Sequence, residues 1–321
     1  MKSRTTAYAP SQHSASGRSE VSALLRTSLE QERCYLRGVA YRITGSVADA
    51  EDVVQESFAR ALAHPPKQQQ EPMRPWLLRV TCHLAIDLLR KRKRRVYVGP
   101  WLPSPISEGE IEQESQSARY AARESLTFAF LLAMEALTPK QRAVLVLRDV
   151  LDLDVRETAN ALHLRESNVK VLHLRARQRL AGYDAQRVDT SRSARERVQQ
   201  TLHQFLIAVA SGNVEQVAAL LADDVVLLND GGGKYLAARK PVQGARLVSK
   251  FFINITRGTD PAQVSIETPE LCGLPALYVR NAVTMPNTAP ASVLGISLNP
   301  AGQIVAIYQV LIDSKLIGVK R

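Results

Sequence analysis

Residues 154–180, DVRETANALHLRESNVKVLHLRARQRL, decide the interpretation of this chain, because they predict two short helices joined by a tight turn. Asp154 followed by Glu157 is typical of a capping box and predicts a first helix that ends near Leu162. A second helix is expected from about Glu166 onward. The turn between them contains no glycine, although a left-handed residue is often needed at such a place.

The second helix has one apolar face and one polar face. Apolar residues recur at spacings of three and four and are expected to be buried together: Val169, Leu172, Ala176 and Leu180. The opposite face can lie in a major groove and touch base edges and phosphates. We therefore predict a helix-turn-helix whose DNA-facing residues are Ser167, Asn168, Lys170, Val171, Leu174, Arg175 and Gln178. The alternative is an ordinary helix pair whose charged face is only solvated.

Length and charge limit the possible classes of protein. The chain has 321 residues, enough for two or three domains, and a net charge of +11. This charge favours a polyanionic partner, either nucleic acid or an anionic membrane surface. No apolar run approaches the roughly 20 residues that span a bilayer, and residues 1–20 lack the apolar core of a signal peptide. We expect a cytoplasmic protein with no membrane association that begins with a disordered, Ser-rich tail over 1–20.

The cysteines and short motifs indicate no metal or cofactor chemistry. Cys34, Cys82 and Cys272 are widely separated and form no C-x-x-C pair, so neither a zinc site nor a disulfide framework is predicted. The usual short signatures of nucleotide, dinucleotide and zinc binding are missing. We therefore predict no metal site and no cofactor.

The first folded segment is expected to be helical, and residues 46–62, SVADAEDVVQESFARAL, mark its clearest helix. Ser46 is the expected N-cap. Residues at a spacing of four are expected to form the buried stripe: Ala50, Val54, Phe58 and Leu62. The opposite face is acidic. It is either a solvated face whose first-turn carboxylates favour the helix dipole, or a docking face for a basic protein.

A strongly basic helix is expected next. After a Pro/Gln-rich loop over 64–75, it begins near Trp76, and its packed side is expected to carry Leu77, Val80, Leu84 and Leu88. It ends in six consecutive cations, residues 90–95. A cationic block that continues an amphipathic helix indicates a DNA-contacting surface. For Trp76 itself, a core position is favoured over stacking on a base.

A linker and a second domain follow. Residues 96–110, VYVGPWLPSPISEGE, contain three prolines and predict a linker with a stiff, extended beginning. An apolar helix is expected over 126–137, and Thr138-Pro139 is a typical capped helix start. Residues 142–150 then lead into the helix-turn-helix.

Three segments and the basic helix, in this order, resemble a bacterial extracytoplasmic-function sigma factor. The three segments are GSVADAEDVVQESFARAL, WLLRVTCHLAIDLLRKRKRR and ALTPKQRAVLVLRDVLDLDVRETANAL. The resemblance implies a region 2 domain over 21–96, a linker over 97–120 and a region 4 helix-turn-helix domain over 121–184. It also implies that the acidic helix binds the clamp helices of core RNA polymerase through Asp49, Glu51, Asp52, Gln55 and Glu56.

The same resemblance assigns the two DNA-reading helices. The helix that begins near Trp76 would open and read the promoter −10 element, and residues 166–178 would read the −35 element. The implied −10 contacts are Trp76, Arg79, His83, Arg90, Lys91, Arg92, Lys93 and Arg94. His83 departs from the family, which more often has Asn at this position.

From about Ser193 the pattern changes to α+β. Helices are expected over 194–210, 214–221 and 244–256, with strands over 225–228, 264–267, 277–283, 292–298 and 304–311. This order predicts a multistranded antiparallel sheet preceded by helices. Residues 193–321 resemble a SnoaL-like domain, a cone of sheet and helices around a pocket. The predicted fold is therefore two all-α sigma domains followed by an α+β SnoaL-like cone.

A subgroup of these sigma factors carries such a C-terminal extension, and VGPWLPSP and NDGGGK resemble its two hallmark segments. Its usual Asn-Pro-Asp-Lys-Leu motif is matched at 312–316 only in the last two residues. The resemblance implies regulation in cis through an intramolecular contact with expected residues Trp101, Leu102, Pro103, Asp230, Gly231, Gly232, Gly233, Lys234, Lys315 and Leu316. For residues 230–234 the alternative is a flexible hairpin turn.

Catalysis by the third domain is not expected. All six histidines lie at or before His203, so acid-base work could fall only to carboxylates such as Asp224 or Asp230, or to Tyr and Lys. We predict a non-catalytic transcription initiation factor with no catalytic residue. The rivals are a SnoaL-like enzyme or ligand sensor fused to a DNA-binding module, and an activator that binds duplex DNA alone. The acidic helix favours the first hypothesis over the last, because an independent activator needs no polymerase-binding face.

Overall fold

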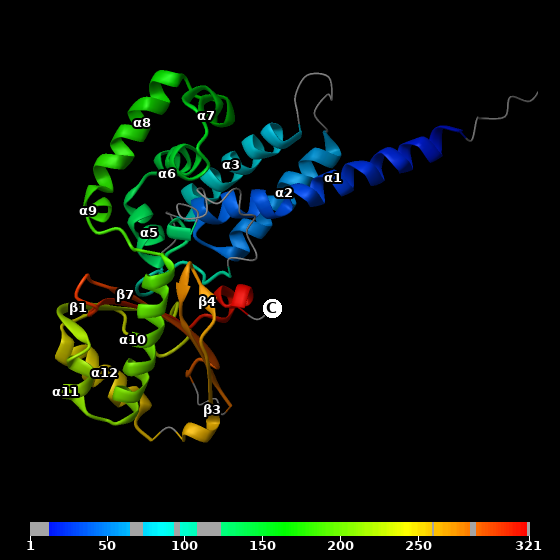
Figure 1. Cartoon of the computed structure of the whole chain (residues 1–321). Helices are drawn as coiled ribbons and strands as arrows, with labels where there is room; N and C mark the ends of the chain where they lie inside the picture. The colour runs from blue at the N-terminus through cyan, green and yellow to red at the C-terminus, as the bar shows by residue number, and fades with distance from the viewer. Residues whose placement is uncertain are drawn as a thin grey trace, which may run out of the picture.

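The computed structural model describes residues 13–64, 73–92, 97–107, 123–258, 260–282 and 287–319. Its elements form three consecutive parts: a first helical group, a second helical group and a third domain of helices and sheet. Figure 1 shows the two helical groups in the upper part of the molecule and the third domain below them. Within these ranges no helix is long and apolar enough to cross a membrane.

The first helical group consists of α1 (His13–Thr44), α2 (Val47–Ala63) and α3 (Met73–Arg92). The three helices pack on one another around a small core. Ser46 caps α2 by accepting a hydrogen bond from the Asp49 backbone N–H at 3.2 Å, as the sequence predicts. The buried side chains of this core are Leu29, Leu36, Val54, Phe58, Ala61 and Leu77.

Two predictions for this group are wrong. Helix α1 begins at His13, so residues 13–20 continue a helix instead of forming a disordered tail, and residues 1–12 lie outside the described ranges. No proline lies between His13 and Thr44 to stop the helix. Leu62 is 42% exposed and not part of the buried stripe. Each step of four residues rotates a side chain by about 40°, so Leu62 lies about 120° away from Ala50 around the helix.

The packed side of α3 also differs from the prediction. Leu77 is buried, but Val80, Leu84 and Leu88 are only half-buried. The fully covered positions are Leu77, Leu78, Thr81, Cys82, Ala85, Ile86 and Leu89. The helix touches α1 and α2 on one side and two helices of the second group, α6 (Pro139–Leu145) and α7 (Val155–Leu162), on another. Two packing partners widen the covered face beyond the single stripe that periodicity predicts.

The second helical group consists of α5 (Phe128–Ala133), η2 (Met134–Ala136), α6 (Pro139–Leu145), a π-helical turn η3 (Val146–Val150), α7 (Val155–Leu162), α8 (Glu166–Arg179) and α9 (Ala181–Asp184). Thr138 with Gln141 and Asp154 with Glu157 both form complete capping boxes. His163 ends α7 in the left-handed conformation with φ of 48°. The predicted helix-turn-helix is therefore present in α7 and α8.

The third domain begins with α10 (Arg192–Ala210) and α11 (Val214–Ala218) and contains one long helix later, α12 (Ala245–Thr256). Its main strands are β1 (Leu221–Asp230), β2 (Val242–Gln243), β3 (Val264–Glu267), β6 (Leu277–Asn281), β7 (Ala291–Leu298) and β8 (Ile304–Val310). Short elements complete it: η4 (Pro261–Gln263), β4 (Glu270–Leu271), β5 (Leu274–Pro275), η5 (Asp313–Lys315) and η6 (Ile317–Val319).

The six main strands form one sheet in the order β2-β1-β8-β7-β6-β3. The α+β class is confirmed, but the expectation of a wholly antiparallel sheet is wrong, because β1 and β8 pair in parallel. The chain builds α12 and the other strands before β8 returns beside β1, and this long connection allows a parallel pair. The antiparallel partner of β1 is β2, which begins at Val242, so residues 231–241 form a long loop and not a tight hairpin turn.

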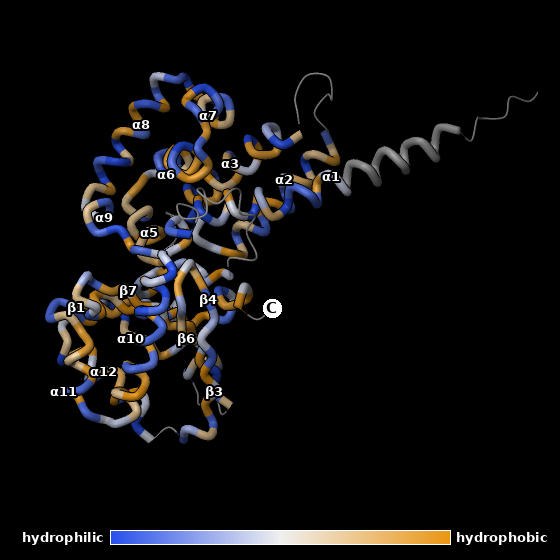
Figure 2. The backbone as a smooth tube through the Cα atoms, in the orientation of Figure 1, coloured by the Kyte–Doolittle hydropathy of each residue, from blue (hydrophilic) through white to orange (hydrophobic). Residues whose placement is uncertain are grey.

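The sheet is covered on both faces. Helices α10 and α12 cover one face, with a core that includes Val198, Leu202, Phe205, Val248, Phe252 and Ile307. On the other face, Val293, Tyr308 and Val310 join the buried cluster of the two helical groups. Seven of the eight residues of β7 are consequently buried, which removes the usual alternation of a half-exposed strand. Figure 2 shows β7 at the level where the third domain meets the helices above it.

Candidate nucleic-acid and polymerase surfaces and the clamp between domains

The outer face of α8 carries all seven residues predicted to read the −35 element, and all seven are exposed: Ser167, Asn168, Lys170, Val171, Leu174, Arg175 and Gln178. Leu174 is 60% exposed and Val171 44% exposed, so the fold leaves two large apolar side chains uncovered beside two cations. An uncovered mixture of this kind indicates a contact surface.

The inner side of α8 fixes this face in space. Val169, Ala176 and Leu180 are buried beneath it, as predicted, whereas Leu172 is half-buried. Asp149 of η3 then binds two side chains of α8, since it lies 2.7 Å from His173 Nε2 and 3.2 Å from Arg177 Nε. Packing and ion pairs together hold α8 with its basic face exposed. Figure 1 shows α8 at the outer edge of the second helical group.

The acidic face of α2 is less uniform than the sequence suggests. Asp52, Gln55 and Glu56 are exposed, and Glu56 pairs with Arg60 one turn along the helix at 2.9 Å. Glu51 is half-buried and accepts a hydrogen bond from Arg33 at 2.5 Å. Asp49 is half-buried too, and it faces the end of α3, 3.8 Å from Arg92.

The residues predicted to read the −10 element lie along α3 in different environments. Arg90 and Lys91 are exposed, whereas Trp76, Arg79, His83 and Arg92 are half-buried. Trp76 packs against the core between the first three helices, and the His83 ring lies 5.5 Å from the His163 ring in the turn of the helix-turn-helix. Lys93 and Arg94 lie outside the described residues. Helices α6 and α7 therefore cover part of the surface of α3.

Arg92 points away from solvent and joins the two helical groups. Its guanidinium donates to the Thr44 carbonyl at 2.8 Å and to Glu135 of η2 at 3.1 Å. Burial lowers its pKa from the usual value. Glu135 also lies 2.9 Å from Arg142, which is buried and donates to the Ile43 carbonyl. Glu135 and Arg142 could not be predicted as interface residues, because both lie in an ordinary amphipathic pattern.

The beginning of the linker is buried between the helical groups and the third domain. Leu102 through Ile106 are all buried. The Ser104 carbonyl accepts from Tyr41 OH at 2.7 Å, and the Ile106 carbonyl accepts from the Cys272 backbone N–H at 2.8 Å. The extended segment thus makes contacts on both sides.

Asp230, at the end of β1, is the centre of what we call the clamp, formed by Tyr97, Trp101, Leu102, Asp230 and Lys315. The Asp230 carboxylate is fully buried and accepts three hydrogen bonds. The donors are Tyr97 OH at 2.5 Å, the Leu102 backbone N–H at 2.8 Å and Lys315 Nζ at 2.6 Å. Burial and the bond to this carboxylate raise the pKa of Tyr97.

Lys315 closes the clamp from the C-terminal tail. Its ammonium also donates to the Leu102 carbonyl at 2.6 Å and lies 4.6 Å from the Trp101 ring and 5.2 Å from the Tyr97 ring. Burial lowers its pKa to about 8, although Asp230 partly opposes this effect. Tyr97 is the one clamp residue that was not predicted from the sequence. Its position directly before VGPWLPSP is the feature of the sequence that could have indicated it.

The glycines of NDGGGK allow the linker and tail to come close. Gly232 has φ of +55°, and a Cβ there would lie 2.7 Å from Ile312 Cδ1. Gly233 has φ of +77°, and a Cβ there would lie 3.2 Å from Val98. Lys234 does not reach another domain, since it pairs with Asp313 of the tail at 2.8 Å.

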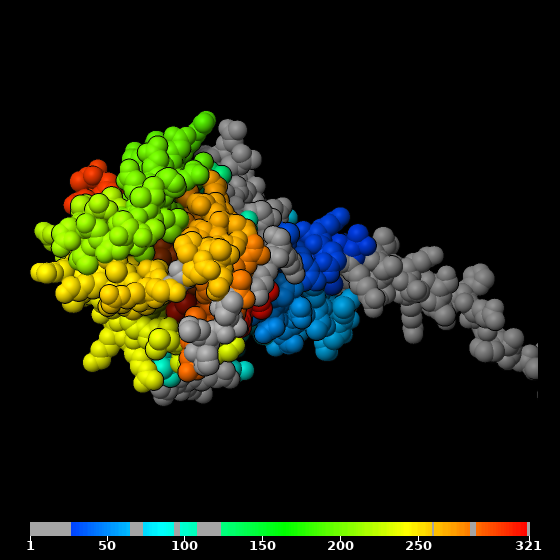
Figure 3. All heavy atoms as spheres, turned by 90° about the horizontal axis from the view of Figure 1, so that it is seen from below, coloured from blue at the N-terminus to red at the C-terminus, as the bar shows by residue number. Residues whose placement is uncertain are grey.

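The tail itself reaches the acidic helix. Leu316 is fully buried, and both η5 and η6 contact α2. Figure 3 shows the red C-terminal residues beside the blue helices of the first group. Pro103, the remaining residue expected in this contact, is buried in the linker.

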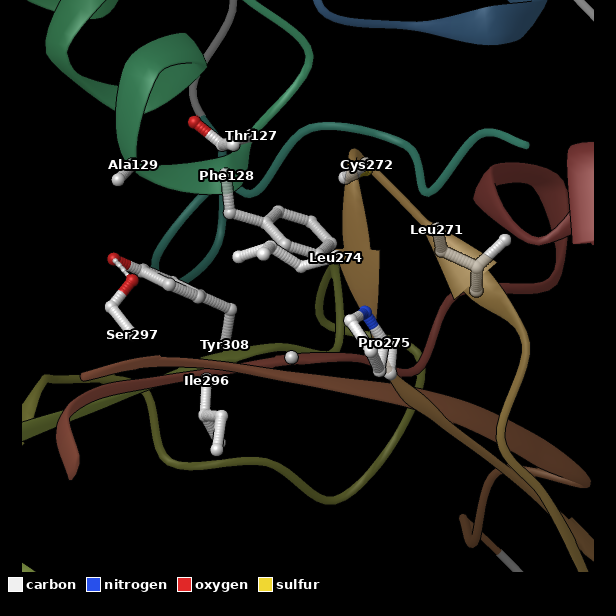
Figure 4. Close-up of a pocket in the computed structure, with 12 residues that line it drawn as sticks. Thr127, Phe128, Ala129, Leu271, Cys272, Leu274, Pro275, Ile296, Ser297 and Tyr308 are labelled. Carbon is white, nitrogen blue, oxygen red and sulfur yellow. Dashed lines mark hydrogen bonds between the residues drawn. The ribbon is translucent and has the colours of Figure 1, made fainter. Parts of the chain in front are cut away.

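A small apolar hollow lies on the face of the sheet that meets the helical domains. It lies where α5 meets β7 and β8 and is lined by residues that include Phe128, Leu274, Gly295 and Tyr308 (Figure 4). Its free volume is about 10 Å³, roughly the space for one water molecule. Among the described residues, no group of three His, Cys, Asp or Glu could hold a metal ion.

Comparison with known proteins gives a consistent assignment. The family model for Sigma-70 region 2 matches residues 29–95, and that for Sigma-70, region 4 matches 127–180. The ECF RNA polymerase sigma factor SigJ of Mycobacterium tuberculosis is 33% identical over 237 residues, covering 73% of this chain and 74% of SigJ. The probable ECF sigma factor SigI of the same species is 28% identical over 291 residues, covering 88% of this chain and 92% of SigI.

A solved structure is similar over nearly the whole chain. The crystal structure of Mycobacterium tuberculosis SigJ superimposes with a TM-score of 0.67 at 26% identity, covering 94% of this chain and 98% of that chain. The likeness thus includes both helical groups and the third domain.

We predict that Lys315 titrates near pH 8 in the folded chain, well below its ordinary value of 10.5. Asp230→Asn should lower this pKa further, because the carboxylate is the main group that favours the charged ammonium. In the wild type, the unfolded chain binds more protons than the folded chain between about pH 8 and 10.5, so the contribution of Lys315 to the free energy of unfolding should rise as the pH is raised through this window. NMR titration of the Lys315 side chain measures the pKa. A value near 10.5 would contradict the burial of Lys315.

Proposed function

This chain belongs to the extracytoplasmic-function sigma factors of bacterial RNA polymerase, and from this premise we propose which of its surfaces meet the polymerase and the promoter. It is a transcription initiation factor with helical region 2 and region 4 domains followed by an α+β SnoaL-like domain. We assign region 2 to residues 21–96, the linker to 97–120, region 4 to 121–184 and the SnoaL-like domain to 193–321. One observation carries the proposal: the chain presents the acidic face of α2 and the basic face of α8 uncovered at the same time.

The polymerase-binding surface is the exposed part of α2. Asp52, Gln55 and Glu56 form its centre, since their side chains project into solvent. Glu51 is positioned by Arg33, and Asp49 lies at the edge that faces α3. An exposed acidic face suits a basic partner because electrostatic complementarity favours association and selects the partner. The partner is the clamp helices of core RNA polymerase.

The −35 element is read by α8. Lys170 and Arg175 can reach phosphates or base edges, while Val171 and Leu174 suit contact with the thymine methyl group. The mechanism is that of a recognition helix in a major groove. Asp149 supports this role from behind, because it holds His173 and Arg177 and so keeps the basic face outward.

The −10 element is read by α3, and the compact arrangement limits access to it. Helices α6 and α7 of region 4 cover part of α3. The Glu135 carboxylate accepts a hydrogen bond from the Arg92 guanidinium, at the group that would otherwise bind a DNA phosphate. Region 4 must therefore move away from α3 before Arg92 and His83 can meet DNA. Arg90 and Lys91 are exposed and supply positive charge for an initial, weaker contact. Lys93 and Arg94, which follow them in the sequence and lie outside the described residues, are assigned to the same contact.

The SnoaL-like domain regulates this opening in cis. The clamp joins the linker, the end of β1 and the tail around one buried carboxylate, and the tail lies against the polymerase-binding helix. An intramolecular contact of this kind acts at an effective concentration of order mM, so a modest interface can hold one arrangement. Gly232 and Gly233 permit the close approach, Gly231 lets the loop fold back on Tyr235 and Ala237, and Lys234 fixes the tail through Asp313.

The SnoaL-like domain works without catalysis, in the cytosol where the polymerase acts. The hollow on its sheet is mostly apolar and nearly filled. Of its hydroxyl groups, Ser297 and Tyr308 bind each other at 3.3 Å, and Thr127 donates to the Glu124 carbonyl at 2.8 Å. Asp230 is occupied by three donors and has no room for a substrate. A ligand sensor fused to the sigma domains is the second candidate, favoured by the hollow itself, although a ligand could enter only by displacing Phe128.

The double substitution Asp52→Ala with Gln55→Ala should weaken binding to core polymerase by about tenfold, equivalent to ~1.4 kcal/mol. Both side chains are exposed, so the fold should not change. The measurement is a titration of labelled core polymerase, with circular dichroism of each variant. The matched control is Glu196→Ala with Gln199→Ala on α10, which removes the same groups at the same spacing. Equal affinity of wild type and the α2 variant would leave the acidic face as solvated surface.

Lys170→Ala and Arg175→Ala should each lower initiation at a −35-dependent promoter, with different signatures. A lost base contact should cost about 1–3 kcal/mol and relax specificity at one position of the −35 element, whereas a lost phosphate contact should weaken all promoters alike. Run-off transcription from a library of −35 variants distinguishes the two. Lys250→Ala and Arg246→Ala on α12 remove exposed cations elsewhere and should leave initiation unchanged. Wild-type activity of both α8 variants would refute the placement of α8 in the major groove.

A further inference from the structure

Phe128 lies between region 4 and the SnoaL-like domain. It is the first residue of α5, yet its ring points out of its own helical domain toward the sheet formed by β7 and β8 (Figure 4). The side chain is only 5% exposed. Its burial therefore depends on another domain.

The sheet has a place that fits this ring. The Tyr308 ring stacks on Phe128 with centroids 5.4 Å apart and planes 24° from parallel. Gly295 of β7 lies beneath it, and a Cβ at this position would come within 3.1 Å of two ring atoms. Any larger residue at this position would occupy the space of the ring. Only about 10 Å³ remains empty in the hollow, so the ring fills it.

The neighbouring aromatic residue behaves differently. Phe130 contacts Tyr183 of its own helical domain, with ring centroids 5.6 Å apart. Thr127 caps α5 by accepting from the Phe130 backbone N–H, so the backbone around Phe128 is held by its own helix. The backbone that carries Phe128 is therefore fixed within region 4, while its ring is packed on the SnoaL-like domain.

We propose that the hollow on the sheet is a receptor for one aromatic ring and that Phe128 is a detachable plug in it, which fastens region 4 to the SnoaL-like domain and so keeps region 4 over α3. The plug is a second attachment, separate from the clamp, because it joins region 4 directly while the clamp joins the linker. The packing of Phe128 on the sheet is a property of the free chain. The proposal rests on the proposed function only where it implies that this packing affects promoter binding.

The test measures the distance between the two domains by double electron-electron resonance. Cys34→Ser removes the exposed cysteine, and spin labels are attached to cysteines introduced at the exposed Gln178 on α8 and Gln303 in the SnoaL-like domain. Cys82 and Cys272 are buried and stay unlabelled. The parent chain should give one narrow distance distribution.

Phe128→Ala should raise the population at longer distances by about tenfold or more, because the ring and its stack on Tyr308 are lost. Gly295→Val tests the same contact from the sheet side, since a strand accepts valine but the hollow would then exclude the ring. Phe130→Ala is the matched control and should keep the parent distribution. If Phe128→Ala and Gly295→Val both retain the parent distribution, the plug does not hold region 4 and the proposal is wrong. The distance measurement uses the free chain and does not depend on binding to polymerase or promoter. Failure of the plug proposal is therefore distinguishable from failure of the proposed function.

Discussion

The arrangement of the domains depends on one buried carboxylate. A charged Asp230 away from water is unstable unless donors surround it, and only one of its three donors, Lys315, belongs to the same domain. The other two, Tyr97 OH and the Leu102 backbone N–H, come from the linker. Separating the linker from the SnoaL-like domain would leave the carboxylate short of partners or force water into its place. The position of the linker is thereby coupled to the fold of the third domain.

Apolar burial reinforces this coupling. The face of the sheet that α10 and α12 do not cover is covered by the helical domains, and β7 has lost the alternation of a half-exposed strand. An isolated SnoaL-like domain would expose Val293, Tyr308 and Val310 to water. The hydrogen bonds of the clamp set the position of the linker on the SnoaL-like domain. Burial of this face of the sheet supplies much of the attraction between the SnoaL-like domain and the helical domains.

The sequence predicts local structure well and interfaces poorly. Capping at Asp154 and Thr138, the packed face under α8 and the order of helices and strands follow from rules that act over a few residues, and all are present. The parallel pair of β1 and β8 and the second covered side of α3 depend on segments far apart in the chain, and periodicity carries no such information. Arg92 shows the consequence for the site: its charge predicts a DNA contact, while Glu135, 43 residues away, turns it inward. Asp230 and Lys315 follow from the family resemblance, whereas Tyr97 is marked only by its place before VGPWLPSP and Phe128 carries no local signal.

The most direct measurement of cis control is run-off transcription by core polymerase with three full-length chains at equal concentration: the wild type, Asp230→Asn and Asp224→Asn. Asp224 lies exposed in the same strand, so its substitution makes the same chemical change outside the clamp. Asp230→Asn should change promoter-specific initiation severalfold while circular dichroism shows intact sigma domains, and Asp224→Asn should match the wild type. Identical transcription by all three chains would contradict control of initiation by the SnoaL-like domain.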